Sequence, residues 1–162
     1  MSIQKKQLAI ALEIYAQEHE LPAEVAALMQ EAKKARANAY TPYSKFKVGA
    51  AIQLSNGEVV TGNNQENAAY PSGMCAERTA IYAAGARFPE AQIKAIAICV
   101  KAHNQIISQP ASPCGACRQA MAEYEQKQKT PIPVYFMGET GPVYKVDAVL
   151  DLLPLAFDSS FL

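Results

Sequence analysis

Three of the four cysteines stand where helices are predicted to begin. Cys114 and Cys117 form a C-x-x-C motif after Pro113, and Cys75 lies upstream at the start of the preceding helix. The unpaired N–H groups and the positive dipole end of a helix start favour the thiolate, which is the form of cysteine that binds a metal. Two helix starts directed at one point would therefore bring three sulfur ligands together. A fourth tetrahedral position would stay open for water, as in catalytic zinc sites.

A C-x-x-C motif alone permits other interpretations. In a dithiol oxidoreductase, Cys114 and Cys117 would carry the reaction, and Cys75 and Glu77 would have no role in it. A structural zinc module without catalysis would need a fourth protein ligand. Disulfides are not expected, because nothing in the sequence indicates export and a chain of this length needs no such bridges.

The remaining candidate ligands have simpler interpretations. Cys99 lies inside the apolar run 96–100, so we expect it to pack in the core. His19 and His103 lie in polar surroundings without ligand-like spacing and are expected at the surface. Only three convincing metal ligands are therefore predicted.

Hydrophobic periodicity predicts the elements that must position these thiols. Helices are expected over residues 5–18, 22–35, 76–84 (with Gly85 as a stop), 114–126 and 147–153. Strands are expected over residues 48–54, 58–62, 93–100, 133–137 and 143–146, the first two forming a hairpin around Asn56-Gly57. This order predicts an α/β fold with three layers, α/β/α, around a mixed, roughly five-stranded sheet. We expect residues 1–22 to be an N-terminal helical extension and residues 23–162 to be the catalytic domain.

Composition limits which binding partners and which cellular compartment are expected. The chain has 162 residues, and its 15 basic side chains balance its 15 acidic ones. Without a net positive field, non-specific nucleic-acid binding loses its main driving force, so no nucleic-acid partner is expected. No apolar run approaches the ~20 residues that span a bilayer, so no membrane association is expected. No secretory signal is recognisable, and the cytoplasm is the expected location.

Five sequence blocks together resemble a known family. The chain carries C-x-E…P-C-x-x-C, in which Cys75 replaces the histidine of the H-x-E…P-C-x-x-C signature of zinc deaminases. The blocks are residues 43–51 (YSKFKVGAA), 62–71 (GNNQENAAYP), 75–80 (CAERTA), 113–119 (PCGACRQ) and Leu152-Leu-Pro154 followed by Phe157. Over about residues 26–157 the chain resembles cytidine deaminases of the small, homotetrameric, three-cysteine zinc type. Residues 1–22 are not explained by this pattern.

The resemblance implies a function and a set of site residues. The reaction would be zinc-dependent hydrolytic deamination of cytidine and 2′-deoxycytidine to uridine and 2′-deoxyuridine plus ammonia, in pyrimidine salvage. Another aminopyrimidine nucleoside or a nucleoside antibiotic remains an alternative substrate. One Zn²⁺ per subunit would be held by Cys75, Cys114 and Cys117, with Glu77 as the proton shuttle. The nucleoside would be bound by Phe46, Asn64, Glu66, Tyr70 and the backbone of Ala76, with Tyr70 and Phe157 reaching it across subunits.

Several of these residues also have purely structural interpretations. Asn64 and Glu66 could cap a loop, and Phe46 could be a core aromatic residue, because Val48 and Ala50 continue its alternation along a strand. These alternatives stay open at the level of sequence.

The electrical charge of the proposed metal site suggests a further role for two arginines. Three thiolates and Zn²⁺ sum to −1, and such electron-rich ligation weakens the acidity of the metal. Arg78 and Arg118 could donate to the sulfurs and restore that acidity. Arg78 is the stronger candidate, because it shares a helix face with Cys75 at i,i+3 spacing; surface ion pairs are the alternative for both.

Overall fold

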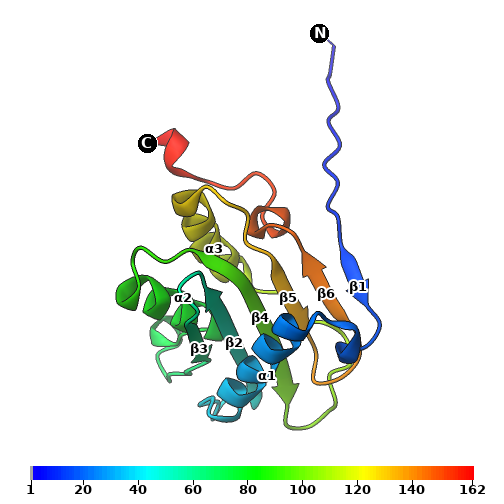
Figure 1. Ribbon diagram of the computed structural model, residues 1–162, viewed down its shortest axis with the longest axis vertical. Coiled ribbons are helices and arrows are strands. Elements are labelled where there is room, and N and C mark those ends of the chain that lie inside the picture. Colours follow the sequence, from blue (N-terminus) through cyan, green and yellow to red (C-terminus); the bar gives the residue numbers. More distant parts are fainter. Residues whose placement is uncertain (1) are drawn as a thin grey trace.

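A six-stranded mixed sheet forms the centre of the computed structural model, which describes residues 2–162 (Figure 1). Its strands are β1 (Glu13–Tyr15), β2 (Phe46–Leu54), β3 (Val59–Asn63), β4 (Ile93–Ala102), β5 (Val134–Met137) and β6 (Val143–Val146). The helices are α1 (Ala23–Ala37), α2 (Ala76–Arg87) and α3 (Gly115–Gln128). Single 3₁₀ turns occupy Glu18–Glu20, Tyr70–Ser72, Val149–Leu152 and Ser159–Phe161.

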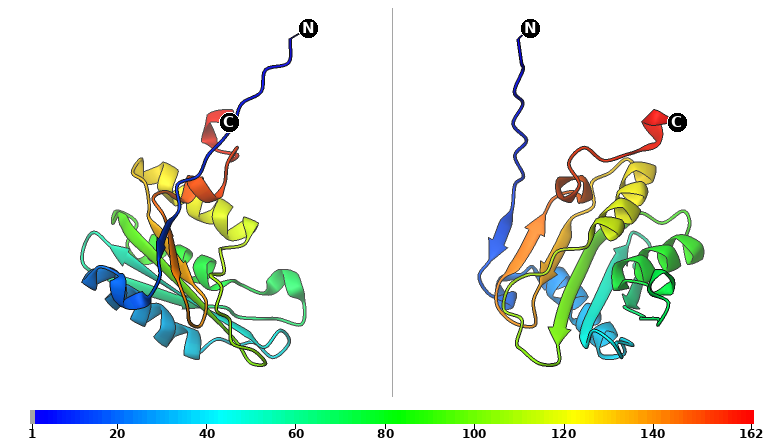
Figure 2. Two further views of the ribbon diagram at one scale, coloured as in Figure 1. Left: turned by 90° about the vertical axis from the view of Figure 1, so that its right-hand side faces the viewer. Right: turned by 180° about the vertical axis from the view of Figure 1, so that it is seen from behind.

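The strand order across the sheet is β1-β6-β5-β4-β2-β3. Only the β4–β5 pair is parallel among the named strand pairs of residues 2–162, and the other pairs are antiparallel. Helix α1 covers one face, while α2 and α3 cover the other (Figures 1 and 2). The predicted three-layer α/β/α architecture with a mixed sheet is confirmed.

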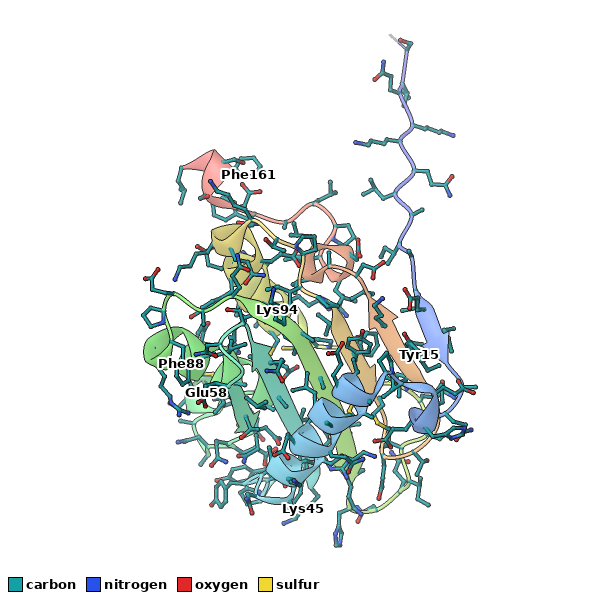
Figure 3. The ribbon with its side chains drawn as sticks, in the orientation of Figure 1. Tyr15, Lys45, Glu58, Phe88, Lys94 and Phe161 are labelled. Atoms are coloured by element: carbon teal, nitrogen blue, oxygen red, sulfur yellow. The ribbon has the colours of Figure 1, made fainter. Side chains whose placement is uncertain are left out.

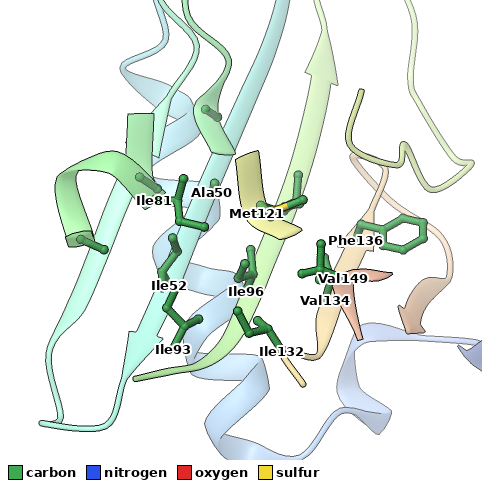
Figure 4. Close-up of a cluster of buried hydrophobic side chains, with 14 of the residues drawn as sticks. Ala50, Ile52, Ile81, Ile93, Ile96, Met121, Ile132, Val134, Phe136 and Val149 are labelled. Carbon is green, nitrogen blue, oxygen red and sulfur yellow. The ribbon is translucent and has the colours of Figure 1, made fainter. Parts of the chain in front are cut away.

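Alternation along the central strands builds a separate core on each face of the sheet. In β4, Ile96 and Ile98 face α2 and α3, whereas Ala97 and Cys99 face α1. Successive strand residues point to opposite faces, so a continuous apolar run fills both cores. Figure 4 shows the larger core, in which Ile81 of α2 and Met121 of α3 meet the strand side chains. Cys99 lies at 0% exposure in the other core, as predicted.

The glycines beside α2 have packing roles. A Cβ on Gly62 of β3 would lie 2.5 Å from the carbonyl oxygen of Ala76, so glycine lets the strand approach the start of α2 closely. The prediction that Gly85 ends this helix is wrong, because α2 continues to Arg87. Gly85 instead makes room for Tyr124 of α3, whose hydroxyl oxygen would lie 2.5 Å from a Cβ there.

The predicted helix over residues 5–18 is wrong. The structure has an extended chain there, and its residues 13–15 form β1 at the edge of the sheet. Every second residue from Leu8 to Ile14 is apolar, which is the period of a strand, and this alternation competes with the helical spacing of Leu8, Leu12 and Tyr15 that predicts a helix. β1 pairs antiparallel with β6 and makes the sheet six-stranded rather than five-stranded. Within residues 2–22 the structure has a single 3₁₀ turn, at Glu18–Glu20, and no α-helix, so the predicted helical extension is wrong there. The domain boundary at residue 22 stays a prediction.

The other predicted elements are present with shifted ends. The hairpin around Asn56-Gly57 is confirmed as β2 and β3. The predicted short helix over 147–153 is a 3₁₀ turn at Val149–Leu152. Among the described residues, no helix is both long enough and apolar enough to cross a membrane.

Candidate functional site

Two helix starts bring the three thiols together. Cys75 immediately precedes α2 and Cys114 immediately precedes α3, and both have extended backbones (φ −74°, ψ 153° and φ −67°, ψ 164°). Cys117 lies in the first turn of α3 and is fully buried. The three sulfur atoms lie within 4.8 Å of one another. The predicted convergence of two helix N-termini is confirmed.

This cluster fits a zinc ion. Tetrahedral coordination with Zn–S bonds of about 2.3 Å places neighbouring sulfurs about 3.8 Å apart, and the Sγ atoms of Cys114 and Cys117 are 3.5 Å apart. Over residues 2–162, the cluster includes no fourth His, Cys, Asp or Glu. Three protein ligands are the set found in catalytic zinc sites, where the fourth position takes water.

The thiols differ in their tendency to ionise. Hydrogen bonds from Cys117 and from Arg78 lower the pKa of Cys75 well below its usual range. The hydrogen bond to Cys75 and burial raise the pKa of Cys117. Cys75 therefore ionises more readily than Cys117, and a bound metal cation would favour the thiolate form of each ligand.

Arg78 occupies the position predicted for it. Its Nη2 lies 3.7 Å from the Cys75 sulfur, one helical turn away. Its Nε is buried and has no hydrogen-bond partner among the described residues. The guanidinium is therefore the positive charge that lies directly against the sulfur cluster.

Arg118 has different partners. Its Nε donates to the Pro113 carbonyl at 2.7 Å, its Nη1 to the Leu152 carbonyl at 2.9 Å and its Nη2 to the Ser112 hydroxyl at 2.9 Å. The predicted donation from Arg118 to sulfur is wrong, because its hydrogen bonds to the described residues all go to oxygen atoms. This arginine ties the segment before Cys114 to the C-terminal part of the chain.

Glu77 is a buried carboxyl beside the thiols. It is the second residue of α2 and is 5% exposed. Burial, with a smaller contribution from the nearby Cys75 charge, raises the pKa of Glu77. A raised pKa favours the protonated form and suits a carboxyl that takes up and passes on protons.

A pocket of about 550 Å³ opens beside Cys75. Its other lining residues include Asn64, Glu66, Tyr70 and Arg78. The structure therefore brings three of the five predicted nucleoside-binding residues to one cavity next to the thiols. Its volume lies in the range of small-molecule sites.

Asn64 and Glu66 each make hydrogen bonds within the protein. The amide of Asn64 accepts from the Val48 N–H at 2.7 Å and donates to the Phe46 carbonyl at 2.9 Å. Glu66 accepts from the N–H groups of Tyr43 and Ser44 at 3.0 and 3.2 Å. The loop-capping interpretation is thus correct for Glu66, whereas the Asn64 side chain binds backbone groups of β2. A carboxylate offers about four lone-pair sites and an amide has a second N–H, so both retain capacity for a ligand.

Hydrogen bonds also set the charge of Glu66. Its slight burial acts to raise the pKa, but the hydrogen bonds from the Ser44 hydroxyl and from the Tyr43 and Ser44 backbone prevail and lower the pKa of Glu66. The carboxylate is therefore ionised at neutral pH and points a negative charge at the pocket.

The other predicted binding residues have different environments, and of these only Tyr70 lines the pocket. Tyr70 is 78% exposed, with its ring edge-on to Tyr43 at 6.4 Å between centroids. Phe46 is half-buried at the start of β2 and does not line the pocket, and Ala76 is buried at the first position of α2. Phe157 lies exposed in the C-terminal segment, where its carbonyl accepts from the side chain of Gln119 at 3.0 Å.

Sequence reasoning assigned no role to the residues that hold Glu66. The Ser44 hydroxyl and two backbone N–H groups bind a carboxylate more than 20 positions away in the chain. The turn-rich composition of residues 40–44 marks a loop, but no local pattern marks its partner. Thr79, whose hydroxyl donates to the Cys75 carbonyl at 3.0 Å, was also missed, although its partner lies only four positions away, a spacing typical of threonine in a helix.

Comparison with known sequences supports a deaminase site. Residues 22–131 match the family model described as the cytidine and deoxycytidylate deaminase zinc-binding region. A cytidine deaminase from Halalkalibacterium halodurans is 42% identical over 130 residues, covering 80% of this chain and 91% of that protein. One from Sporosarcina psychrophila is 42% identical over 137 residues, with coverages of 83% and 91%.

Solved structures give the same result. The crystal structure of cytidine deaminase from Burkholderia pseudomallei superimposes with a TM-score of 0.70 at 41% identity, covering 85% of this chain and 100% of that chain. The cytidine deaminase structure from Mycobacterium tuberculosis has a TM-score of 0.64 at 30% identity.

Proposed function

This chain belongs to the cytidine and deoxycytidylate deaminase zinc-binding family, and we propose that it is a zinc-dependent enzyme that hydrolyses cytidine to uridine and ammonia. The observation that carries the proposal is a buried carboxyl, Glu77, beside three thiols that converge from two helix starts. 2′-Deoxycytidine is included as a substrate, yielding 2′-deoxyuridine. This activity places the protein in pyrimidine salvage.

The residues that would hold the zinc ion are Cys75, Cys114 and Cys117. Zinc bound there would supply an activated water for attack on C4 of the pyrimidine. Three protein ligands leave the fourth position for that water, which distinguishes the site from a structural zinc module.

Glu77 moves the protons of the reaction. Its carboxylate accepts one proton from the attacking water and delivers it to N3 of the ring. The remaining hydroxyl proton then passes by way of Glu77 to the amino group on C4. The C4–N bond breaks as this nitrogen leaves, so cytidine and water become uridine and ammonia.

Arg78 balances the charge of the three thiolates. Its contact with the Cys75 sulfur would reduce electron donation from that sulfur to a zinc ion held there, and so favour the acidity that the reaction needs. Arg118 acts at a distance from the sulfurs by holding the carbonyl of Pro113, next to Cys114.

The nucleoside would occupy the pocket beside Cys75. Glu66 and Asn64 would bind the ribose hydroxyls with the hydrogen-bonding capacity that their protein contacts leave free. Phe46 would pack on the nucleoside from the start of β2, and the Ala76 backbone would read the pyrimidine at the end of the pocket near the thiols.

Self-association is part of this proposal. Tyr70 and Phe157 are exposed aromatic residues, at 78% and 58%, and each would contact nucleoside bound to another subunit of a homotetramer. The cytoplasm is the proposed location. A small-molecule nucleoside and further copies of this chain are the proposed partners.

Ultraviolet monitoring of the purified protein tests the function. We expect loss of the cytidine and 2′-deoxycytidine absorbance, little change with free cytosine because the ribose contacts are missing, and about one zinc per chain. Zinc measured on the same sample separates loss of metal from loss of function. A protein with full zinc content and no turnover of either nucleoside would contradict the proposal.

A further inference from the structure

The N-terminal segment leaves the body of the molecule as an extended arm. Residues 2–12 have no helix or strand and are exposed throughout. Figures 2 and 3 show the arm running away from the sheet beyond Tyr15, with its side chains in open space. The family match begins only at residue 22, so the deaminase fold does not account for the arm.

One side of this arm is apolar. Leu8, Ile10 and Leu12 of the arm, with Ile14 of β1 after them, alternate with other residues and are 51%, 50%, 42% and 60% exposed. Alternation with a period of two is typical of a strand with one buried face, whereas these side chains are largely uncovered within one chain. The arm leads directly into β1, which lies at the end of the sheet order and presents an open edge. These features indicate a strand that pairs with a strand of another molecule.

We propose that residues 4–14 pair antiparallel with the same segment of a second copy of this chain, about a two-fold axis at Ala9. The pairing joins β1 of one protomer to the arm of the other and covers both open edges. Such an interface is isologous, since each protomer contributes the same surface.

Self-complementarity of the sequence supports this partner and this register. Around Ala9, Leu8 lies opposite Ile10 of the partner subunit, which keeps the apolar side chains on one face. Lys5 lies opposite Glu13 of the partner subunit, so the basic start of one arm meets the acidic end of the other. Centring the pairing on Ile10 instead would place Lys5 opposite the partner's Tyr15 and lose this charge pair.

The arm and the sulfur site lie at different parts of the sheet. β1 forms one edge, whereas the pocket residues Asn64 and Glu66 directly follow β3, which forms the other edge. Changes in the arm are therefore expected to alter association at the β1 edge, and not the pocket or the separate subunit contacts proposed for Tyr70 and Phe157.

Site-directed cross-linking tests the pairing. In the zinc-loaded full chain, Ala9→Cys places two thiols across the two-fold axis, with Cα atoms about 5 Å apart and within disulfide range. Gln4→Cys is the matched control, because its copy would lie about 34 Å away, ten strand positions along the ribbon. We expect mild oxidation to give disulfide-linked dimers with Ala9→Cys and several-fold fewer with Gln4→Cys. The unsubstituted chain measures any background from the native thiols.

Two further measurements test whether the cross-link reports this specific pairing of the two arms. Adding Leu8→Ser and Leu12→Ser to Ala9→Cys should abolish the cross-link and lower the mass measured by light scattering, with cytidine turnover per chain unchanged. Equal cross-linking at positions 4 and 9 would indicate random collision of arms and overturn the proposal. Absence of cross-linking at position 9, or an unchanged mass in the serine variant, would overturn it as well.

Discussion

Cysteines on the two faces of the sheet have opposite chemical properties. Cys75 caps α2, where hydrogen bonds from Cys117 and Arg78 lower its pKa. Cys99 lies within β4 on the α1 face, and burial raises its pKa to about 11. The same residue type is thus a metal ligand at a helix start and an inert apolar side chain within a strand. The position of the cysteine, at a helix start or within a buried strand, therefore decides which of these two roles it has.

The largest predicted effect comes from removing the cysteine on the α2 and α3 face. Cys75→Ala removes one of three zinc ligands, so we expect loss of bound zinc and of detectable cytidine turnover, with the fold retained because the core on that face does not include Cys75. Metal analysis, circular dichroism and the deamination assay on the same preparation check this.

Cys99→Ala is the matched control. It should keep zinc and turnover and cost only about 1 kcal/mol of unfolding free energy. Loss of zinc in this variant, or its retention in Cys75→Ala, would remove the distinction between the two faces.

Glu77→Gln should give the next largest effect. The amide keeps the shape of the side chain but cannot take up a proton, so we expect kcat to fall by about 10²- to 10⁴-fold with zinc content unchanged. Steady-state kinetics and metal analysis measure the two quantities. Turnover close to that of the unsubstituted protein would exclude Glu77 as the proton carrier and leave the thiol cluster without its acid.

Substitutions of Arg78 and Arg118 distinguish an arginine that contacts sulfur from one that binds backbone carbonyls. Arg78→Gln removes the positive charge from the Cys75 sulfur, and we expect about a 10-fold lower kcat with zinc retained. Arg118→Gln removes hydrogen bonds to two backbone carbonyls, so its main effect should be about 2 kcal/mol of lost stability. Denaturant unfolding and kcat measured on both variants distinguish them. Interchanged results would mean that contact with sulfur does not determine the catalytic role.

A smaller effect is expected at the pocket. Glu66→Gln keeps the side-chain shape but removes the negative charge that faces the ribose site, and we expect KM to rise about 10-fold with little change in kcat. Because the Glu66 carboxylate also holds the 43–44 loop, a thermal melt must accompany the kinetics. Reduced stability with an unchanged KM would show that loop capping is its entire role.

Much of this site could be predicted from the sequence because its parts are local. Helix starts at Cys75 and Cys114 follow from apolar periodicity and from the turn residues before them, and the dipole argument then assigns their chemistry. Long-range hydrogen bonds leave no such pattern. The carboxylate of Glu66 meets Ser44 in a distant loop, and Arg118 meets the Leu152 carbonyl. Only the folded chain shows that these groups are already bonded.

The N-terminal error has a different physical origin. Leu8, Leu12 and Tyr15 fit a helical face, while the alternation through Ile10 and Ile14 fits a strand. Local propensity does not decide between them, because the outcome depends on an open edge of β6 that only the tertiary fold provides. Tyr15 then packs against Tyr135 with ring centroids 6.5 Å apart, a contact that the extended form makes available.

The smallest predicted signal comes from the thiol of Cys99 in the intact protein. At pH 8 this thiol is protonated, because its pKa of about 11 lies above that pH, and its exposure is 0%. Alkylation by iodoacetamide should therefore require the molecule to open. β4 lies in the middle of the sheet, so that opening is global and its free energy should equal the free energy of unfolding. Labelling rates across a denaturant series, read by mass spectrometry with zinc bound, measure this value. Labelling of Cys99 in native buffer at the rate of an exposed thiol would show that the α1 face opens without unfolding of the whole sheet. The two faces would then differ in how firmly they are packed, and not in whether their cysteines can react.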